Sequence, residues 1–382
     1  MDLFSTGLLP KATALLSKIV QNTVSLTLTR TAPDLIESSN ILVTDKSIFQ
    51  LKGKATPGAQ ISVARDGDSQ FNDGTGVADE NGDFSIDVSL LNNATNRGRN
   101  TLVVQATGTN GTQKTETLSL HYAVGDVVRF ATSSGNFDFE LLNDAAPNTV
   151  QNFLSYLQRY GGTIIHRSKR TDTGQPFIVQ GGGFDLDDAT NELSQVVTSV
   201  PIANEFNSAN RNLRGTLAMA LPPGNINGAT SQWFINMSDA NTSLDALSFV
   251  VFGRIIGDGM TVVDSIHNTP TFDLASKLSF PDLTDIPLLN YTAFSTQLPG
   301  TVTLTADSRD VVGVGTNFTQ VLKAGERIRI SGQEFIVANV VDDTNLTLAT
   351  SASLSASSLA VFANANPTSD NFVKISSIST IL

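Results

Sequence analysis

An arginine, two amide side chains and an apolar cluster recur among glycines and strand-like runs between Ile164 and Arg254. In order, the segments are IIHR, PFIVQGGGF, NEF, RGTLAMA, NGATSQWFIN and FVVFGR. A guanidinium group is always charged and presents a rigid fork of hydrogen-bond donors. Beside an apolar slot, such a fork can hold a carbonyl group without the help of a nucleophile or a metal ion.

Composition argues against several other kinds of site. The 382 residues contain no cysteine, which excludes disulfides, cysteine-ligated zinc and thiol catalysis. The three histidines, His121, His166 and His267, are far apart in sequence, so we do not expect a histidine-based metal site. The net charge is −12 without a cluster of lysines and arginines along the chain, which argues against a nucleic-acid partner. NEF and the acidic run 185–192 supply carboxylates without a partner base, which favours a solvated loop over a hydrolase or metal centre.

Taken together and in this order, the segments resemble the cyclophilin family of peptidyl-prolyl cis/trans isomerases, in its bacterial form. The resemblance covers somewhat under half of the chain and implies a closed eight-stranded antiparallel β-barrel with two capping helices. It also implies catalysis of rotation about Xaa-Pro bonds, against an amide-resonance barrier of about 18–20 kcal/mol. A catalyst must stabilise the twisted amide more strongly than the planar one, and this requires no cofactor.

The resemblance implies a role for each matching position. Arg167 would hold the prolyl carbonyl, Gln180 would hydrogen-bond the substrate backbone, and Phe234 would form the floor of the proline pocket. The other substrate-binding positions implied in this way are Phe177, Ile178, Ala220, Leu221, Gln232, Leu244 and Phe249.

Some of these positions have an ordinary structural alternative. A lone arginine is more often part of a surface ion pair, and isolated phenylalanines such as Phe177 and Phe234 are more often core. Alternation along a strand places Ile178 and Gln180 on one face, so Phe177 reaches the pocket only if the strand starts late. His166 is expected to be structural, since the chemistry needs no base.

The sequence departs from the family around the expected pocket. Between Arg167 and Phe177 lies SKRTDTGQP, a longer spacer than is common, which we expect to reshape the pocket rim or to carry a substrate contact. Ser243 precedes Leu244 where many family members have a tryptophan, and Phe249 occupies the place of a histidine in those proteins. The pocket is therefore expected to bind proline, and to bind cyclosporin only weakly.

The elements that must position these residues begin near Gly125. VVRFATSSGNFDFELL predicts two strands joined at SSGN, with Phe137 and Phe139 on one face. Apolar spacing in APNTVQNFLSYLQ (146–158) predicts a helix, and GMTVVDSIHN (259–268) predicts a second, shorter one. These elements match the order expected of a cyclophilin.

Two further regions precede this part of the chain. Residues 1–21 are expected to form a helix or a leader. Residues 22–123 contain short alternating runs separated by turns such as ATPGA and DENGD, a pattern typical of an antiparallel sandwich. This region resembles bacterial immunoglobulin-like domains. Its acidic cluster, Asp79–Asp83, is interpreted as a hairpin turn rather than a calcium site.

The C-terminal region carries its own strand pattern. Residues 296–365 predict a small all-β domain, and residues 366–382 resemble the closing strand of bacterial cyclophilins. We therefore expect a cyclophilin-like domain that spans 125–295, is interrupted by an inserted β domain, and ends with 366–382. Insertions of this kind are tolerated where chain ends lie close together on a surface loop.

These observations favour a peptidyl-prolyl isomerase that assists folding of proline-containing peptides and unfolded proteins, without a cofactor. The alternative is a surface or periplasmic peptide- or protein-binding module with a catalytically weak cyclophilin barrel. The immunoglobulin-like region favours a periplasmic or extracellular setting, whereas the missing basic n-region and cleavage site leave a cytoplasmic one open. No apolar run is long enough to span a membrane.

Overall fold

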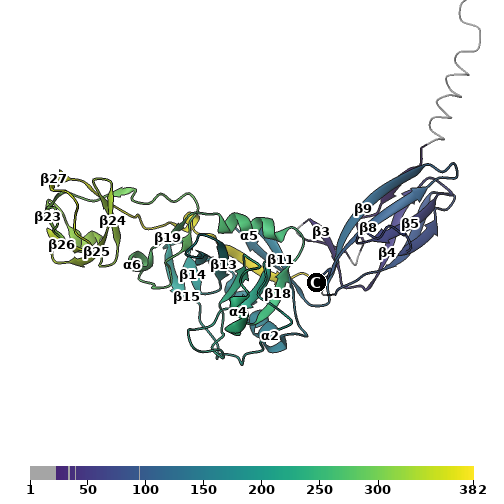
Figure 1. The fold of residues 1–382 in the computed structure, drawn as a ribbon, viewed down its shortest axis with the longest axis horizontal. Helices are drawn as coiled ribbons and strands as arrows, with labels where there is room; N and C mark the ends of the chain where they lie inside the picture. Colours follow the sequence, from purple (N-terminus) through teal and green to yellow (C-terminus); the bar gives the residue numbers. More distant parts are fainter. Residues whose placement is uncertain (1–22, 33–34, 39, 94) are drawn as a thin grey trace, which may run out of the picture.

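The computed structural model describes residues 23–382, apart from residues 33–34, 39 and 94. Figure 1 shows β-rich bodies in a row: an N-terminal body, a central body, and a smaller one formed by residues 296–363. The chain is mainly β, as the sequence predicts, and its helices are short. No described helix is long and apolar enough to cross a membrane. The segment 1–21, expected to be a helix or a leader, lies outside the described residues.

The N-terminal body is a β-sandwich with a core between its two sheets. Its strands are β1 (Leu26–Leu28), β2 (Ile36–Ser38), β3 (Ile41–Thr44), β4 (Ile48–Ala55), β5 (Gln60–Arg65), β6 (Gly74–Val77), β7 (Asp83–Ser89), β8 (Arg99–Thr107) and β9 (Gln113–Tyr122). One sheet has the order β1-β4-β7 and the other the order β2-β3-β9-β8-β5-β6. Alternate residues of β4 and β7 are buried, which follows from their alternating hydrophobic pattern.

One strand pair corrects the prediction of an antiparallel sandwich. β3 and β9 run parallel, with Leu42 opposite Leu120. A parallel pair needs a long crossover connection, and the strands between β3 and β9 provide it. The likeness of this sandwich to immunoglobulin domains stays a prediction from sequence.

An eight-stranded antiparallel sheet forms the central body. Its strands are β10 (Val127–Thr132), β11 (Gly135–Leu141), β12 (Arg167–Arg170), β13 (Pro176–Gly181), β16 (Thr216–Met219), β17 (Trp233–Asn236), β18 (Val251–Ile255) and β29 (Ile375–Thr380). Their order is β12-β13-β17-β16-β18-β11-β10-β29. The curled sheet closes less regularly than the predicted barrel, because its edges meet just before β12 and at the start of β29. There Ile164 bridges Lys374, and the Ile165 N–H donates to the Val373 carbonyl at 2.9 Å.

The two faces of this sheet have different surroundings. Val179, Leu217 and Ile235 are fully buried in the main core, together with Phe137 and Phe139. Helices α2 (Pro147–Ser155), α3 (Leu157–Tyr160) and α5 (Gly259–His267) contribute to the same core. Apolar spacing predicts α2 and α5, whereas the single helix expected over 146–158 is divided at Tyr156 into α2 and α3. Residues that alternate with these core positions point to the opposite, outer face.

Shorter elements surround the central sheet. They are the strand pairs β14 (Phe184–Asp187) with β15 (Glu192–Gln195) and β19 (Thr271–Phe272) with β20 (Ile286–Pro287), and the helices α4 (Ser243–Ala246) and α6 (Ala275–Leu278). The acidic run 185–192 therefore forms a hairpin with strands on both sides, which corrects the expected loop. Its strands can pair because Leu186 and Leu193 lie opposite each other and pack on a small apolar cluster.

The C-terminal body has its own apolar core and an eight-stranded sheet. Its elements are β21 (Thr296–Gln297), β22 (Thr301–Leu304), β23 (Asp310–Val314), α7 (Phe318–Val321), β24 (Arg327–Ile330), β25 (Gln333–Val340), β26 (Asn345–Leu348), β27 (Ala356–Leu359) and β28 (Val361–Ala363). Thr296 pairs with Ala363, so the chain enters and leaves this body side by side. It then passes through the short helix η1 (Ser369–Asn371) to β29, which pairs with β10 of the central sheet.

Candidate active site

A row of directly opposed residues crosses four neighbouring strands of the central sheet. Arg167 of β12 lies opposite Gln180 of β13, Gln180 opposite Phe234 of β17, and Phe234 opposite Ala218 of β16. Directly opposed residues in an antiparallel sheet project from the same face. The charged group, one amide and the aromatic floor predicted from sequence therefore lie next to one another on the outer face.

A groove of about 460 Å³ lies at the polar end of this row. Its lining includes Arg167, Gln180, Ala220, Leu221 and Gln232, all of which are predicted site residues. The Gln180 side chain donates through Nε2 to Oε1 of Gln232 at 2.8 Å, and the Ala220 N–H donates to the Gln232 carbonyl at 2.9 Å. These bonds fix the two amides beside the guanidinium.

The apolar end of the row is a separate cluster on the same face. The predicted residues Ile178, Phe234 and Leu244 are buried in it, and Phe177, Ala220 and Phe249 pack against it. The rings of Phe234 and Phe249 meet edge to face, with centroids 5.5 Å apart. Ala220 belongs to both the groove lining and this cluster, so the two halves of the site adjoin.

A β-bulge explains how Phe177 joins the apolar cluster. Lys169 pairs with Ile178, whereas Arg170 pairs with Pro176, so Phe177 is the extra residue of the bulge. Simple alternation would place Phe177 and Ile178 on opposite faces. The bulge bends the start of β13, which allows both side chains to pack on the cluster.

The guanidinium of Arg167 is held near a carboxylate without being hydrogen-bonded to it. Its Nε lies 3.9 Å from Oδ2 of Asp285, and the side chain is 35% exposed. Asp285 instead accepts from Nζ of Lys169 at 3.2 Å and from the Thr284 hydroxyl at 2.9 Å. Within the described part of the chain, the Arg167 Nε is buried and has no hydrogen-bond partner. The Nη groups of this guanidinium likewise have no acceptor among the described residues, and the side chain is partly exposed, so a ligand in the groove can reach it.

His166 is buried next to Arg167 and contributes packing. Its ring meets Phe184 edge to face at 5.1 Å. Burial, and then the charge of Arg167, lower the pKa of His166 to about 3, while Gln232 offsets part of this shift. The imidazole is therefore neutral near pH 7, consistent with a structural role.

The groove has a wall that sequence motifs did not indicate. Pro281, Asp282 and Thr284, from the segment between α6 and β20, line it opposite the motif residues. Leu283, fully buried in the cluster around Phe184, anchors this segment. No local pattern marks these residues as site residues; the buried Leu283 within an otherwise polar run is the one signal available.

The long spacer SKRTDTGQP (168–176) lies outside the groove lining. It forms the end of the β12–β13 hairpin, where the Thr171 N–H donates to the Gln175 carbonyl at 2.9 Å. Residues 168–172 line a different cavity, together with His267 and Asp285. Burial, and then the charge of Arg170, lower the pKa of His267 to about 4. The spacer residues do not line the groove, but the pairing of Arg170 with Pro176 within the spacer produces the bulge that brings Phe177 into the apolar cluster.

Two acidic segments have structural partners. Glu205 of NEF accepts the backbone N–H groups of Asn148 and Thr149 at 3.1 and 2.7 Å, at the start of α2. Glu205 is thus a helix cap and not part of a solvated loop, because its loop folds over the helix. In the turn after β6, Asp79 accepts the N–H groups of Asn81 and Asp83 at 2.8 Å each. No group of three or more histidine, aspartate or glutamate side chains in the described residues is arranged to hold a metal ion.

Comparison with known proteins decides the family. A family model described as "Cyclophilin type peptidyl-prolyl cis-trans isomerase/CLD" matches residues 127–284. A peptidyl-prolyl cis-trans isomerase of Acinetobacter baylyi is 42% identical over 159 residues, which cover 40% of this chain and 78% of that protein. The chain belongs to the cyclophilin family. Peptidyl-prolyl cis-trans isomerase B of Escherichia coli is 38% identical over 153 residues, which cover 38% of this cyclophilin and 86% of that protein.

A solved structure gives a further likeness. It is a cyclophilin type peptidyl-prolyl cis-trans isomerase of Cryptosporidium parvum in the presence of the dipeptide Ala-Pro. That protein is 29% identical and covers 38% of this cyclophilin and 87% of its own chain, with a TM-score of 0.30.

As a cyclophilin, this chain is a peptidyl-prolyl cis-trans isomerase, so the family and the enzyme class predicted from sequence are confirmed. The match begins at the first residue of β10 and ends beside the groove wall, so the sandwich, the C-terminal body and β29 lie outside it.

Proposed function

We propose that Arg167 is the charged donor of the isomerisation and holds the prolyl carbonyl while the imide bond twists. In the planar state the imide nitrogen shares its electron pair with the carbonyl group and accepts hydrogen bonds poorly. In the twisted state that nitrogen becomes pyramidal and basic. A guanidinium that holds the prolyl carbonyl and also donates to this nitrogen therefore binds the twisted state more strongly than the planar one, which is the condition for catalysis.

The observation that carries this proposal is the guanidinium itself. It lines a groove, lies next to an apolar cluster, and is 3.9 Å from the carboxylate of Asp285 without a hydrogen bond to it. An arginine serving only as a surface ion pair would be expected to make direct contact with its carboxylate. Arg167 instead keeps its donors free for a substrate.

The remaining site residues divide into two tasks in this proposal. Phe177, Ile178, Phe234, Leu244 and Phe249 receive the proline ring, since they form one apolar cluster next to the guanidinium. The flanking peptide is held by residues of the groove, which are Gln180, Ala220, Leu221 and Gln232. The proposed substrates are proline-containing peptides and unfolded proteins, and the task is assistance of folding.

Substitution of Arg167 tests the mechanism. Arg167→Ala should lower kcat/KM by about 10²–10³, the effect of removing one preorganised donor. Arg167→Lys should restore only part of the loss, because a point charge does not reproduce the fork. A protease-coupled isomerisation assay measures both variants, with thermal unfolding as the control for folding. A folded Arg167→Ala protein with full activity would contradict the proposed role.

Cyclosporin affinity tests the far wall of the pocket. Ser243, which begins α4 and is exposed, provides neither an aromatic surface nor an N–H donor next to Leu244. Burial of a large aromatic side chain is worth about 1.5–3 kcal/mol, so Ser243→Trp should tighten cyclosporin binding roughly ten- to a hundred-fold. Inhibition titrations of the two proteins measure this difference. Nanomolar inhibition that the substitution leaves unchanged would show that other residues build this wall.

A further inference from the structure

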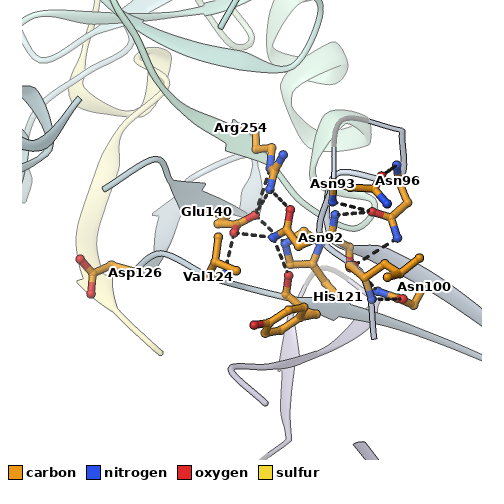
Figure 2. A network of polar contacts seen from close by, with 12 residues as sticks. Asn92, Asn93, Asn96, Asn100, His121, Val124, Asp126, Glu140 and Arg254 are labelled. Atoms are coloured by element: carbon orange, nitrogen blue, oxygen red, sulfur yellow. Dashed lines mark hydrogen bonds and ion pairs between the residues drawn. The ribbon is translucent and has the colours of Figure 1, made fainter. Parts of the chain in front are cut away.

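A buried polar network joins the N-terminal sandwich to the central sheet (Figure 2). Its centre is Glu140 of β11, which is fully buried and accepts from Nε and Nη2 of Arg254 at 3.0 and 2.7 Å. From the sandwich side, His121 meets the same carboxylate at 2.9 Å, and Asn92 donates to it at 3.1 Å. Burial raises the pKa of Glu140, but the contacts with His121 and Arg254 outweigh it and hold the pKa below its usual value. The carboxylate is thus ionised and fixes the orientation of Arg254.

The sandwich loop before β8 is fixed by its own asparagines, which Figure 2 shows beside this network. Asn96 accepts the N–H groups of Asn93 and Gly98 at 3.1 and 3.2 Å, and Asn100 donates to the Gly98 carbonyl at 2.8 Å. A side chain at Gly98, whose φ is +85°, would meet the ring of His121 at 2.6 Å. Only glycine allows the loop to approach the end of β9 this closely, so Gly98 fixes the neighbouring Arg97 and Arg99 beside this strand end.

Between this loop and the central sheet lies a cavity of about 190 Å³ with a cationic lining. Arg97 and Arg99 come from the sandwich, Arg214 and Arg254 come from the central body, and His121 completes the set. No aspartate or glutamate belongs to the described lining. The chain as a whole has 36 acidic and 24 basic residues. The lining of this cavity is therefore positively charged although the chain is acidic overall. The four arginines are distant in sequence and come together only in the fold.

The charges of these arginines are not all offset within the protein. Arg214 pairs with Asp264 at 2.6 Å, and Arg254 pairs with Glu140. Arg97 and Arg99 are exposed, and neither guanidinium contacts a carboxylate or another acceptor among the residues that the structure describes. Two uncompensated guanidinium groups at one concave site repel each other, and a bound anion would relieve that repulsion. A planar guanidinium fork also matches the oxygens of an oxyanion.

We propose that this cavity binds a small tetrahedral oxyanion of the phosphate class, held by Arg97 and Arg99 from the sandwich and by Arg214 and Arg254 from the central body. The volume corresponds to roughly six water molecules, which suits a small ion. Because the ligand would touch both bodies, its binding stabilises their attachment. The site is separate from the substrate groove, whose lining shares no residue with it.

Calorimetric titration of the full chain with sodium phosphate, against sodium chloride at matched ionic strength, tests the site. We expect saturable binding and a rise in the midpoint of thermal unfolding with phosphate and no such response with chloride. Arg97→Gln with Arg99→Gln should weaken phosphate binding by about a hundred-fold, about ten-fold for each charged donor removed. Both side chains are exposed, so the double variant should fold normally and keep its isomerase activity.

Two matched controls make the result decisive. Lys52→Gln removes one positive charge from an exposed position of the sandwich away from the cavity, and should bind phosphate as the parent protein does. Arg167→Ala should also bind normally, which separates this site from the substrate groove. Equal binding by the parent and the double variant would overturn the proposal. So would a lack of saturable phosphate binding by the parent protein, or an equal loss in Lys52→Gln.

Discussion

Arg167 and His166 are neighbours in sequence, but the arginine is charged at neutral pH and the histidine is neutral. The arginine remains charged at the groove, and its charge adds to burial in lowering the pKa of His166 to about 3. An imidazole that stays neutral across the physiological range can support the site without adding a competing charge. The histidine therefore affects folding and not the proton balance of the reaction.

Acid should destabilise the protein partly through His166. Its folded pKa of about 3 lies below the ordinary 6.5, so the unfolded chain takes up the proton first. The stability that depends on the neutral ring is complete above about pH 6.5 and is lost as the pH falls toward 3. At pH 5 the loss amounts to about 2 kcal/mol. Denaturant unfolding of the parent and of His166→Phe at pH 7 and pH 5 should show a steeper decline in the parent.

Other titrating groups contribute equally to the pH dependence of the parent and of His166→Phe. The pKa values of Glu140 and Glu205 are lowered, so both carboxylates also lose stabilising contacts in acid, and they do so in both proteins. The difference between the two pH profiles isolates the imidazole. An identical pH dependence would show that His166 is not buried in its neutral form.

The residues that the sequence proposes for the site lie together in the structure, whereas the residues around them could not be named from the sequence. Motif order was sufficient to name Arg167, Gln180 and Phe234, because these residues occur in short segments with recognisable neighbours. Asp282 could not be found in this way, since it reaches the groove through the anchoring of Leu283 in a distant cluster. The burial of Glu140 could not be predicted from the sequence either. Alternation along the strand predicts that it points outward, but not that the N-terminal sandwich covers it.

Helix α2 starts without a cap of its own. Its N-cap residue is Ala146, which has no side-chain acceptor, and Pro147 fits the first turn because its missing N–H would have no helical partner there. Glu205 supplies the missing acceptor from a loop far along the chain, and its negative charge also suits the helix N-terminus. Long-range capping of this kind ties the helix to the loop before β16.

Removal of this cap should therefore be costly. Glu205→Ala leaves the N–H groups of Asn148 and Thr149 without their carboxylate and should lower the free energy of unfolding by about 1–2 kcal/mol. Glu192→Ala is the matched control, since it removes an exposed glutamate whose side chain has no partner in the described structure. Urea unfolding monitored by fluorescence of Trp233 measures both. Equal stability of the two variants would argue against the cap.

Elements with a strong internal period were predictable, and elements shaped by distant partners were not. Spacing alone predicted α2 and α5, and alternation predicted β4, β7 and β8. The bulge at Phe177 depends on how β12 pairs with β13, which no local pattern encodes. The parallel pairing of β3 with β9 likewise depends on the arrangement of the whole sandwich.

At the scale of the molecule, the C-terminal body is proposed to be an insertion in the isomerase domain. Replacement of residues 296–365 by a short Gly/Ser linker should leave a cooperatively folded, active enzyme, because closing a loop of this length costs little. The contacts that would be lost include the Lys277–Glu326 pair at 3.3 Å, the Arg327–Asp273 pair at 3.5 Å and the Lys323–Ser279 hydrogen bond at 3.1 Å. Thermal unfolding and the isomerase assay report the outcome.

Deletion of residues 366–382 provides the contrast. It removes β29 and exposes the edge of β10, so this protein should lose both cooperative unfolding and activity. A linker variant that behaves like the deletion would show that the C-terminal body is required for the fold of the central sheet.

The pairing of β29 with β10 also determines when, during synthesis of the chain, the central sheet can be completed. Arg129 and Ser379 lie opposite each other although they are about 250 residues apart in sequence. On a ribosome, the sandwich can fold first and the C-terminal body can fold while the central sheet still lacks an edge strand. The central sheet becomes complete only after β29 has left the exit tunnel. A stalled or truncated chain would carry every residue of the substrate groove and still lack the sheet that holds them in place.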